Sequence, residues 1–177
     1  MGKRLNFWPL AGFLTVSVLG TLAHFAYEWS GKQLLAGAFC AVNESTWEHM
    51  KLLFFPALLF TMIQIAAARE RDGAIPAVRA VSITAGLLLI PVLYYTYTGI
   101  LGRHVLWADI AIFYLAAALM FRLDSCLRRR RRLWEPWQQA AGLLWLWGLA
   151  FLFVWWTFRP PHIGLFLDPA TGGYGIA

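Results

Sequence analysis

A polar stretch passes directly into an apolar one at Asn43-Glu44-Ser45-Thr46-Trp47-Glu48-His49-Met50-Lys51-Leu52-Leu53-Phe54-Phe55-Pro56. From Ser45 to Ala68 the chain stays almost wholly apolar, which is long enough for a helix to cross the hydrocarbon core of a bilayer, since that takes about 17 to 25 residues. The ionisable side chains of this segment gather at its first turns. The sequence therefore predicts a membrane-spanning helix whose first turns carry the ionisable side chains of Glu48, His49 and Lys51.

Four further segments have a comparable length and the same continuous apolar character, and they cover residues 7–28, 75–98, 105–121 and 138–158. The composition agrees, because 60% of the residues are apolar and 14% are charged, whereas soluble domains are about half apolar and a quarter charged. Continuous apolar runs favour helices over an alternating barrel pattern. We expect an all-α fold, a polytopic membrane helix bundle with five transmembrane helices that forms a single domain over residues 1–177.

The basic residues predict the orientation of this bundle. With the N-terminus in the cytoplasm, eleven of the fifteen Lys and Arg residues fall on the inner side and four on the outer side. The N-terminus is therefore predicted inside and the C-terminus outside. The run from Arg128 to Arg132 is interpreted as an orientation anchor, with a patch for anionic lipid as the alternative. The apolar composition excludes nucleic acid as a partner.

Most ionisable groups that remain fall on the predicted outer side. They are all four histidines and five of the nine acids, namely His24, His49, His104, His162, Glu28, Glu44, Glu48, Asp109 and Asp168. Such groups are costly in or near membrane spans and usually face a bundle interior or a wet cavity. Their one-sided distribution predicts a site. The other four acids, Glu70, Asp72, Asp124 and Glu135, are interpreted as solvated partners of cytoplasmic arginines.

Helical spacing divides the predicted site into two stripes. Ser17, Thr21, His24 and Glu28 share one face of the first span, and Glu44, Glu48 and Lys51 share one face at the start of the second. A divalent metal such as zinc is expected as the cofactor, with ligands from His24, Glu28, Glu44, His162 and Asp168. Catalytic acid–base work is assigned to Glu48, His49 and Asp109.

Structural roles stay open for several of these residues. Ser45 and Glu48 match a capping box. His24 and Glu28 match a hydrogen-bonded pair one helical turn apart, and Asp109 could form an ion pair with Arg103. The two cysteines are predicted on opposite sides of the membrane, so no disulfide is expected between them.

The segment after the last span is predicted to be an extracytoplasmic tail or lid, residues 159–177. Pro160 and Pro161 end the preceding helix because they remove backbone donors. The apolar residues 163–167 are followed by turn residues, so the tail is expected to fold back over the outer cavity. This would bring His162 and Asp168 to the predicted site.

Three motifs are recognisable along the chain. They are His24-Phe25-Ala26-Tyr27-Glu28-Trp29, the stretch from Asn43 to Lys51, and the tail Pro160-Pro161-His162-Ile163 with Asp168-Pro169-Ala170-Thr171-Gly172. Together they resemble a family of small uncharacterised bacterial integral membrane proteins. The resemblance implies a multi-pass protein of the bacterial plasma (inner) membrane and supplies no activity.

Three classes of function follow from these observations. The first is a metal-dependent hydrolase or transferase that acts on a lipid-like substrate, with the lipid bilayer and a lipid-like or small-molecule ligand at the outer face as partners. The second is a small-solute or ion transporter or permease subunit, since buried acids and histidines also form proton relays. The third is a non-catalytic membrane sensor or assembly partner. A haem-binding protein, with the haem held by two of the histidines, is a fourth hypothesis for the same residues.

Overall fold

The structure is a computed structural model that describes residues 2–67, 74–129 and 133–176, with side chains from residue 7 onward. This part of the chain is helical. Its elements are α1 (Gly2–Trp29), α2 (Leu34–Phe39), α3 (Thr46–Ala67), α4 (Ile75–Leu101), α5 (Leu106–Arg129), α6 (Pro136–Phe158) and the short 3₁₀ helix η1 (Gly164–Phe166).

The five long helices α1, α3, α4, α5 and α6 are each long and apolar enough to cross a membrane. This confirms the predicted all-helical fold with five candidate spans. One boundary differs clearly, because α5 continues to Arg129 and does not end near Phe121. The extension carries an ion pair between Asp124 and Arg128 one turn apart, with Arg128 Nε 3.0 Å from Asp124 Oδ2. The short helix α2 lies in a connection for which no helix was predicted.

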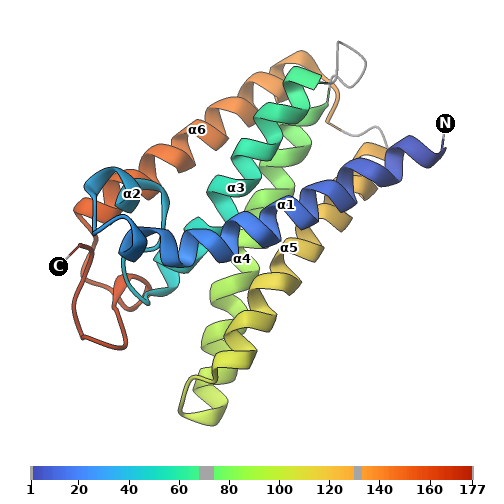
Figure 1. Cartoon of the computed structure of the whole chain (residues 1–177). Helices are drawn as coiled ribbons and strands as arrows, with labels where there is room; N and C mark the ends of the chain where they lie inside the picture. The colour runs from blue at the N-terminus through green and yellow to red at the C-terminus, as the bar shows by residue number, and fades with distance from the viewer. Residues whose placement is uncertain (1, 68–73, 130–132, 177) are drawn as a thin grey trace.

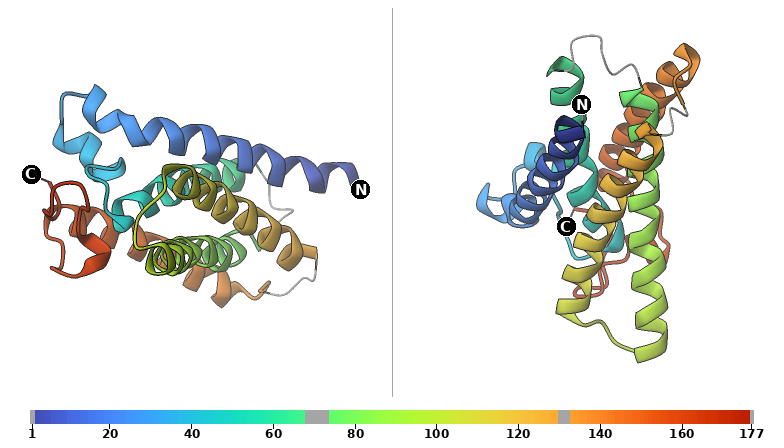
Figure 2. Two further views of the ribbon diagram at one scale, coloured as in Figure 1. Left: turned by 90° about the horizontal axis from the view of Figure 1, so that it is seen from below. Right: turned by 90° about the vertical axis from the view of Figure 1, so that its right-hand side faces the viewer.

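The long helices form a bundle with two distinct ends (Figures 1 and 2). One end, which we call the N-terminal end, consists of the start of α1, the end of α3, the start of α4, the end of α5 and the start of α6. The opposite end, which we call the tail end, consists of the end of α1, helix α2, the start of α3, the end of α6 and residues 159–176. Helices α4 and α5 form an antiparallel hairpin, and α1 packs across α3 and α5.

Apolar side chains fill the middle of the bundle. Fully buried examples are Val16, Leu53, Phe54, Ala57, Ile83, Ala116, Met120, Leu146 and Phe153. Small residues allow helices to cross closely in this bundle, as is typical of membrane helix pairs. A Cβ at Gly142 of α6 would lie 2.7 Å from the backbone of Ala77 of α4, so this crossing requires glycine.

A network of buried charges lies at the N-terminal end and corrects one sequence prediction. Arg79 is fully buried; its Nη2 donates to Gln64 Oε1 at 2.8 Å, and its Nε lies 3.6 Å from Asp124 Oδ1. Asp124 is also buried, so the interpretation of this acid as a solvated partner of arginines was wrong. The reason is that α5 stays helical past Phe121 and turns Asp124 toward α4. Glu135, by contrast, is exposed and caps α6. Glu70, Asp72 and Arg130–Arg132 lie outside the described residues.

Candidate metal centre

A buried ion pair between Glu48 and Lys51 organises the tail end. Lys51 Nζ lies 2.6 Å from Glu48 Oε2, and the two side chains are 0% and 2% exposed for Lys51 and Glu48. Lys51 also donates to the carbonyl oxygen of Gly37 in α2 and to Thr157 Oγ1 in α6, both at 2.8 Å. All three ammonium hydrogens therefore have an acceptor.

The Glu48 carboxylate is bound from two further directions. Its Oε2 accepts from the backbone N–H of Val42 at 3.1 Å, and Thr157 Oγ1 lies 3.1 Å from its Oε1. The ion pair thus joins α2, the connection before α3, α3 itself and α6. Because a buried charge that loses its partner is strongly destabilising, this arrangement fixes how the four segments meet.

The start of α3 has only half of the predicted capping box. Ser45 Oγ accepts from the Glu48 N–H at 3.3 Å, as predicted. The Glu48 side chain does not return to the N–H of Ser45, because Asn43 Oδ1 accepts that hydrogen at 2.9 Å. Asn43 thereby leaves the Glu48 carboxylate to Lys51. The sequence pattern placed Lys51 on the same stripe as Glu48, but it gave no sign that this lysine is buried.

Next to this ion pair, His24, Glu44 and His49 form a compact group. They come from α1, the connection before α3, and α3, and one potential ligand atom of each lies within 4.8 Å of the others. Glu44 Oε1 is 3.9 Å from His24 Nε2, and Glu44 Oε2 is 3.5 Å from His49 Nε2. The side chains are 30%, 53% and 33% exposed for His24, Glu44 and His49, so the group is reachable from outside.

One hydrogen bond of the His49 ring indicates which of its nitrogens could serve as a ligand. Its Nδ1 is 3.0 Å from the carbonyl oxygen of Ser45. A carbonyl oxygen only accepts, so Nδ1 carries a hydrogen and the neutral ring keeps its lone pair on Nε2, the atom that faces Glu44. Metal-binding histidines are usually oriented by such a second hydrogen bond. His24 Nδ1 is buried and has no hydrogen-bond partner in the described part of the chain.

Two imidazoles and one carboxylate are a donor set that suits zinc. Catalytic zinc sites commonly have three protein ligands and leave a fourth position for water or substrate. His24, Glu44 and His49 match this pattern in residue type and number. Of the predicted metal ligands, the structure brings together His24 and Glu44, and the third member of the group is His49, which the sequence analysis assigned to acid–base work.

Two other residues that the sequence analysis assigned to the site, Glu28 and Asp109, lie outside this group and have other partners. Glu28, at the end of α1, is exposed and forms an ion pair with Lys32 at 3.5 Å, so its partner is not His24. Asp109 of α5 accepts a hydrogen bond from Tyr97 of α4 and lies 3.6 Å from His104. The structure gives it these partners in place of Arg103.

The predicted tail residues take part in the internal structure of the tail. Asp168 is buried and accepts from the N–H of Ala170 at 3.0 Å and from Thr171 Oγ1 at 2.6 Å. His162 stacks on Tyr174 with ring centroids 4.6 Å apart. Among the described residues, neither side chain is part of the His24–Glu44–His49 group.

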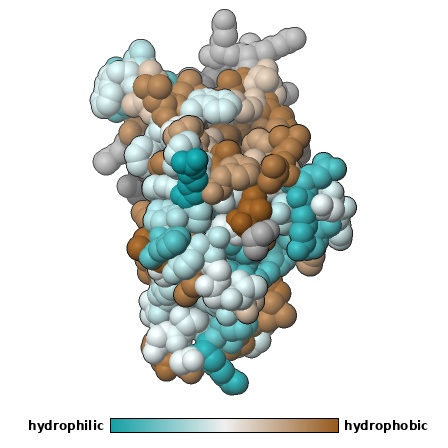
Figure 3. All heavy atoms as spheres, turned by 90° about the vertical axis from the view of Figure 1, so that its left-hand side faces the viewer, coloured by the Kyte–Doolittle hydropathy of each residue, from teal (hydrophilic) through white to brown (hydrophobic). Residues whose placement is uncertain are grey.

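The tail packs onto the tail end of the bundle through aromatic and polar contacts. Phe166 is buried beside Trp47 and Trp156, with ring centroids at 4.8 and 5.5 Å. Asn43 Nδ2 donates to the Gly175 carbonyl oxygen at 2.9 Å, and Tyr95 donates to that of Gly164 at 3.0 Å. Figure 3 views this end of the molecule, where hydrophilic side chains spread across a face that also carries hydrophobic patches.

Fold and site together define a class: the described part of the chain is an all-helical bundle with five candidate membrane spans and a group of two histidines and one glutamate at its tail end. The chain belongs to the family of unknown function DUF6512, whose model matches residues 2–176. This agrees with the resemblance to an uncharacterised family that its motifs indicated. Comparisons with curated proteins and with solved structures gave no significant match.

The Glu48–Lys51 ion pair generates a stability prediction. Lys51→Met leaves the Glu48 carboxylate buried without its counter-ion, so we expect the free energy of unfolding to fall by about 3–5 kcal/mol. Glu48→Gln added to Lys51→Met removes the unpaired charge and should restore most of this loss. The measurement is unfolding by SDS titration in mixed micelles.

Lys32→Met is the matched control, since Lys32 is exposed and its ion pair with Glu28 is worth about 1 kcal/mol at most. If Lys51→Met is no more destabilising than Lys32→Met, or if the double variant is less stable than Lys51→Met alone, the organising role of this ion pair is wrong.

Proposed function

We propose that this protein is a metal-dependent membrane enzyme in which His24, Glu44 and His49 bind a divalent cation such as zinc. The metal would serve a hydrolase or transferase reaction on a lipid-like substrate at the membrane surface. The observation that carries the proposal is the convergence of two imidazoles and a carboxylate within 4.8 Å of one another, from three separate segments of the chain.

The donor set explains which chemistry the site would support. With three protein ligands, zinc keeps a position for a water molecule, whose pKa it lowers, or for a carbonyl or phosphoryl oxygen of the substrate, which it polarises. His49 is then a ligand, whereas the sequence analysis assigned it to proton transfer. Glu48 acts as a positioning residue, because its ion pair with Lys51 holds the first turn of α3 from which His49 projects.

Apolar side chains around the group favour a lipid-like substrate over a small polar one. The ring of Phe25 lies 5.0 Å from that of His24, Trp29 stacks on Phe25 at 5.6 Å, and both aromatic side chains are exposed. Leu34 and Leu35 of α2 are exposed at the same end. A polar centre beside exposed aromatic and aliphatic side chains suits a molecule with a polar head and an apolar tail, and such residues anchor proteins at the membrane interface.

We further propose that this centre faces the extracytoplasmic side of a bacterial plasma membrane. The support is the distribution of basic residues, because Arg122, Arg128 and Arg129 lie at the N-terminal end of the bundle and the candidate centre lies at the tail end. Fully buried Leu53, Phe54 and Ala57 of α3 separate the polar ends, which favours a one-sided site over a transport path.

Metal binding is the first test of the proposal. Full-length protein in mild detergent, equilibrated with buffered zinc and analysed for bound metal, should hold about one zinc per chain. His24→Ala, Glu44→Gln and His49→Ala should each weaken zinc binding roughly a hundredfold or more, since even the loss of a ligand's outer-shell partner costs about 10–100-fold.

His104→Ala, His162→Ala and Glu28→Gln are matched controls, because these residues lie outside the group and should leave zinc binding unchanged. The enzymatic part is tested separately, with zinc-loaded and chelated protein in vesicles of bacterial polar lipids and mass spectrometry of the lipids. Zinc-dependent lipid products that Glu44→Gln abolishes support the enzyme; bound zinc without such products contradicts the enzyme and leaves the metal centre standing.

The two native cysteines permit a test of the orientation. Cys126 is exposed on α5 toward the N-terminal end, so in a Cys40→Ala variant a membrane-impermeant maleimide should label it only after cells are permeabilised. Burial raises the pKa of the Cys40 thiol, even though Lys51 nearby favours the thiolate, so this cysteine is a poor reporter at neutral pH. The outer reporter is therefore Gln33→Cys, at an exposed position, in a variant without both native cysteines.

Intact cells should label the Gln33→Cys protein and leave Cys126 unlabelled. The reverse pattern would put the candidate centre in the cytoplasm and contradict the proposed orientation.

A further inference from the structure

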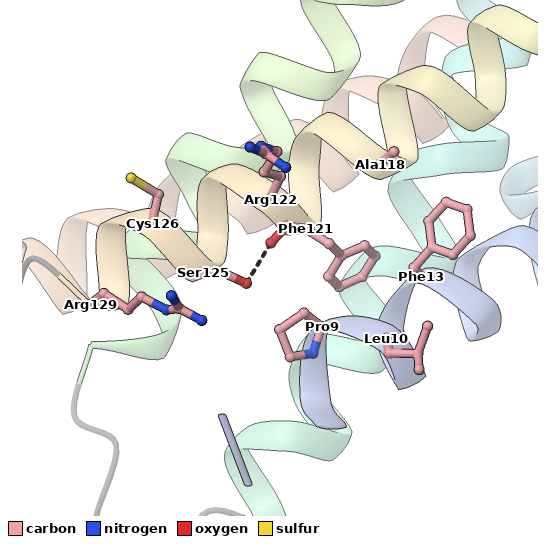
Figure 4. A pocket seen from close by; sticks show the side chains of 9 residues that line it. All are labelled: Pro9, Leu10, Phe13, Ala118, Phe121, Arg122, Ser125, Cys126 and Arg129. Atoms are coloured by element: carbon pink, nitrogen blue, oxygen red, sulfur yellow. Dashed lines mark hydrogen bonds between the residues drawn. The ribbon is translucent and has the colours of Figure 1, made fainter. Parts of the chain in front are cut away.

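A second feature of the molecule lies at the N-terminal end, away from the candidate metal centre. It is a hollow of about 670 Å³ between the first half of α1 and the second half of α5, open along one side (Figure 4). Its volume falls in the range of about 300–1,000 Å³ that is typical of ligand sites. We call it the α1–α5 groove, and it is lined by Pro9, Leu10 and Phe13 of α1 and by α5 residues between Ala118 and Arg129.

The lining of the groove changes in polarity along α5. Ala118 and Phe121 line the part nearer the middle of the bundle, and α1 adds only apolar side chains opposite them. Closer to the end of α5 the lining includes Arg122, Ser125 and Arg129, whose spacing of three and four residues puts them on one side of the helix. An apolar channel therefore leads to two exposed guanidinium groups, whereas the Ser125 hydroxyl group donates to the carbonyl oxygen of Phe121 at 2.9 Å within α5 (Figure 4).

The floor of the groove is held in place by buried contacts. The ring of Phe121 is buried, lies 5.9 Å from the ring of Phe60, and has the guanidinium of Arg79 4.8 Å from its centroid. Gly12 of α1 lies so close to Phe121 that a Cβ there would clash with the ring. Phe121 therefore contacts side chains of α3 and α4 and the backbone of α1, and the hollow is bounded on this side by the packed bundle.

The groove opens on the outer surface of the helix bundle, which faces lipid where the helices span the membrane. Leu10 is 60% exposed, and α1 contacts the rest of the bundle chiefly through α3 and α5. The molecules that meet this surface are lipids. A phospholipid has the same arrangement of apolar and charged parts as the groove, because its apolar acyl chains are joined to a charged phosphate.

We propose that the α1–α5 groove binds an anionic phospholipid of the bilayer. Its phosphate lies at the guanidinium groups of Arg122 and Arg129, and an acyl chain lies between Leu10 and Phe13 of α1 and Ala118 of α5. Hydrogen bonds from guanidinium to phosphate are among the strongest in proteins, which favours a phosphate at this point. Lipids with no cationic group in the head are favoured, because an ammonium group would meet two arginines. The proposal is independent of the metal centre.

Native mass spectrometry of full-length protein in detergent tests this proposal, with phosphatidylglycerol and phosphatidylcholine of identical acyl chains as probes. Wild-type protein should retain phosphatidylglycerol about 25-fold better than phosphatidylcholine, which is the product of about fivefold for each of two arginines. Since each basic residue near an anionic membrane surface contributes about fivefold, Arg122→Gln with Arg129→Gln should abolish this preference. Arg103→Gln with Arg159→Gln, which removes two arginines away from the groove, is the control and should retain it.

A second variant keeps the charge and fills the space. Ala118 is exposed and lines the groove, so Ala118→Trp should leave the fold intact and lower retention of phosphatidylglycerol. Equal retention of the two lipids by wild-type protein, or equal losses in the two double variants, would overturn the proposal. So would a dimer that Ala118→Trp dissociates without any change in lipid retention, because the groove would then be covered by a second copy of the chain.

Discussion

The tail end of this bundle depends on one constraint, which is that the buried charges of Glu48 and Lys51 have to neutralise each other. Two ions without access to water are tolerated only when their attraction is supplemented by further hydrogen bonds. Lys51 meets this requirement through Gly37 and Thr157, and Glu48 through Val42 and Thr157. The requirement therefore fixes the direction in which α3 begins, and with it the positions of the residues around its first turn.

The candidate metal centre is a consequence of that constraint. With α3 held at Glu48 and Lys51, His49 projects from its first turn toward α1, where His24 lies, and Glu44 in the preceding connection faces both rings. Preorganisation of this kind matters for a metal site, because ligands that are already close lose little freedom when the ion binds. The N-terminal end has its own buried charges at Arg79 and Asp124, and the apolar core separates the two ends.

The spans were predictable from the sequence, because their length and continuous apolar character follow directly from the thickness of a bilayer. The approach of His24 to Glu44 was also predictable, because a short connection makes consecutive helices neighbours. Burial was not predictable in the same way: Lys51 and Asp124 look like surface charges in the sequence, and only the packing of α6 and α4 against them encloses them. The sequence analysis named Glu28 as a metal ligand, but His49 takes that place in the group. The reason is related, since the turns between Trp29 and Thr46 determine which side of each helix faces the group.

X-ray absorption spectroscopy at the zinc edge of the zinc-loaded full-length protein can show whether His24, Glu44 and His49 form one metal site. We predict a first shell of nitrogen and oxygen at about 2.0–2.1 Å, with the multiple-scattering signature of two imidazoles, and no sulfur at about 2.3 Å. The same spectrum should be absent from Glu44→Gln protein treated identically, because little zinc would remain bound. A shell that contains sulfur from a cysteine, or a shell with fewer than two imidazoles, would contradict the account.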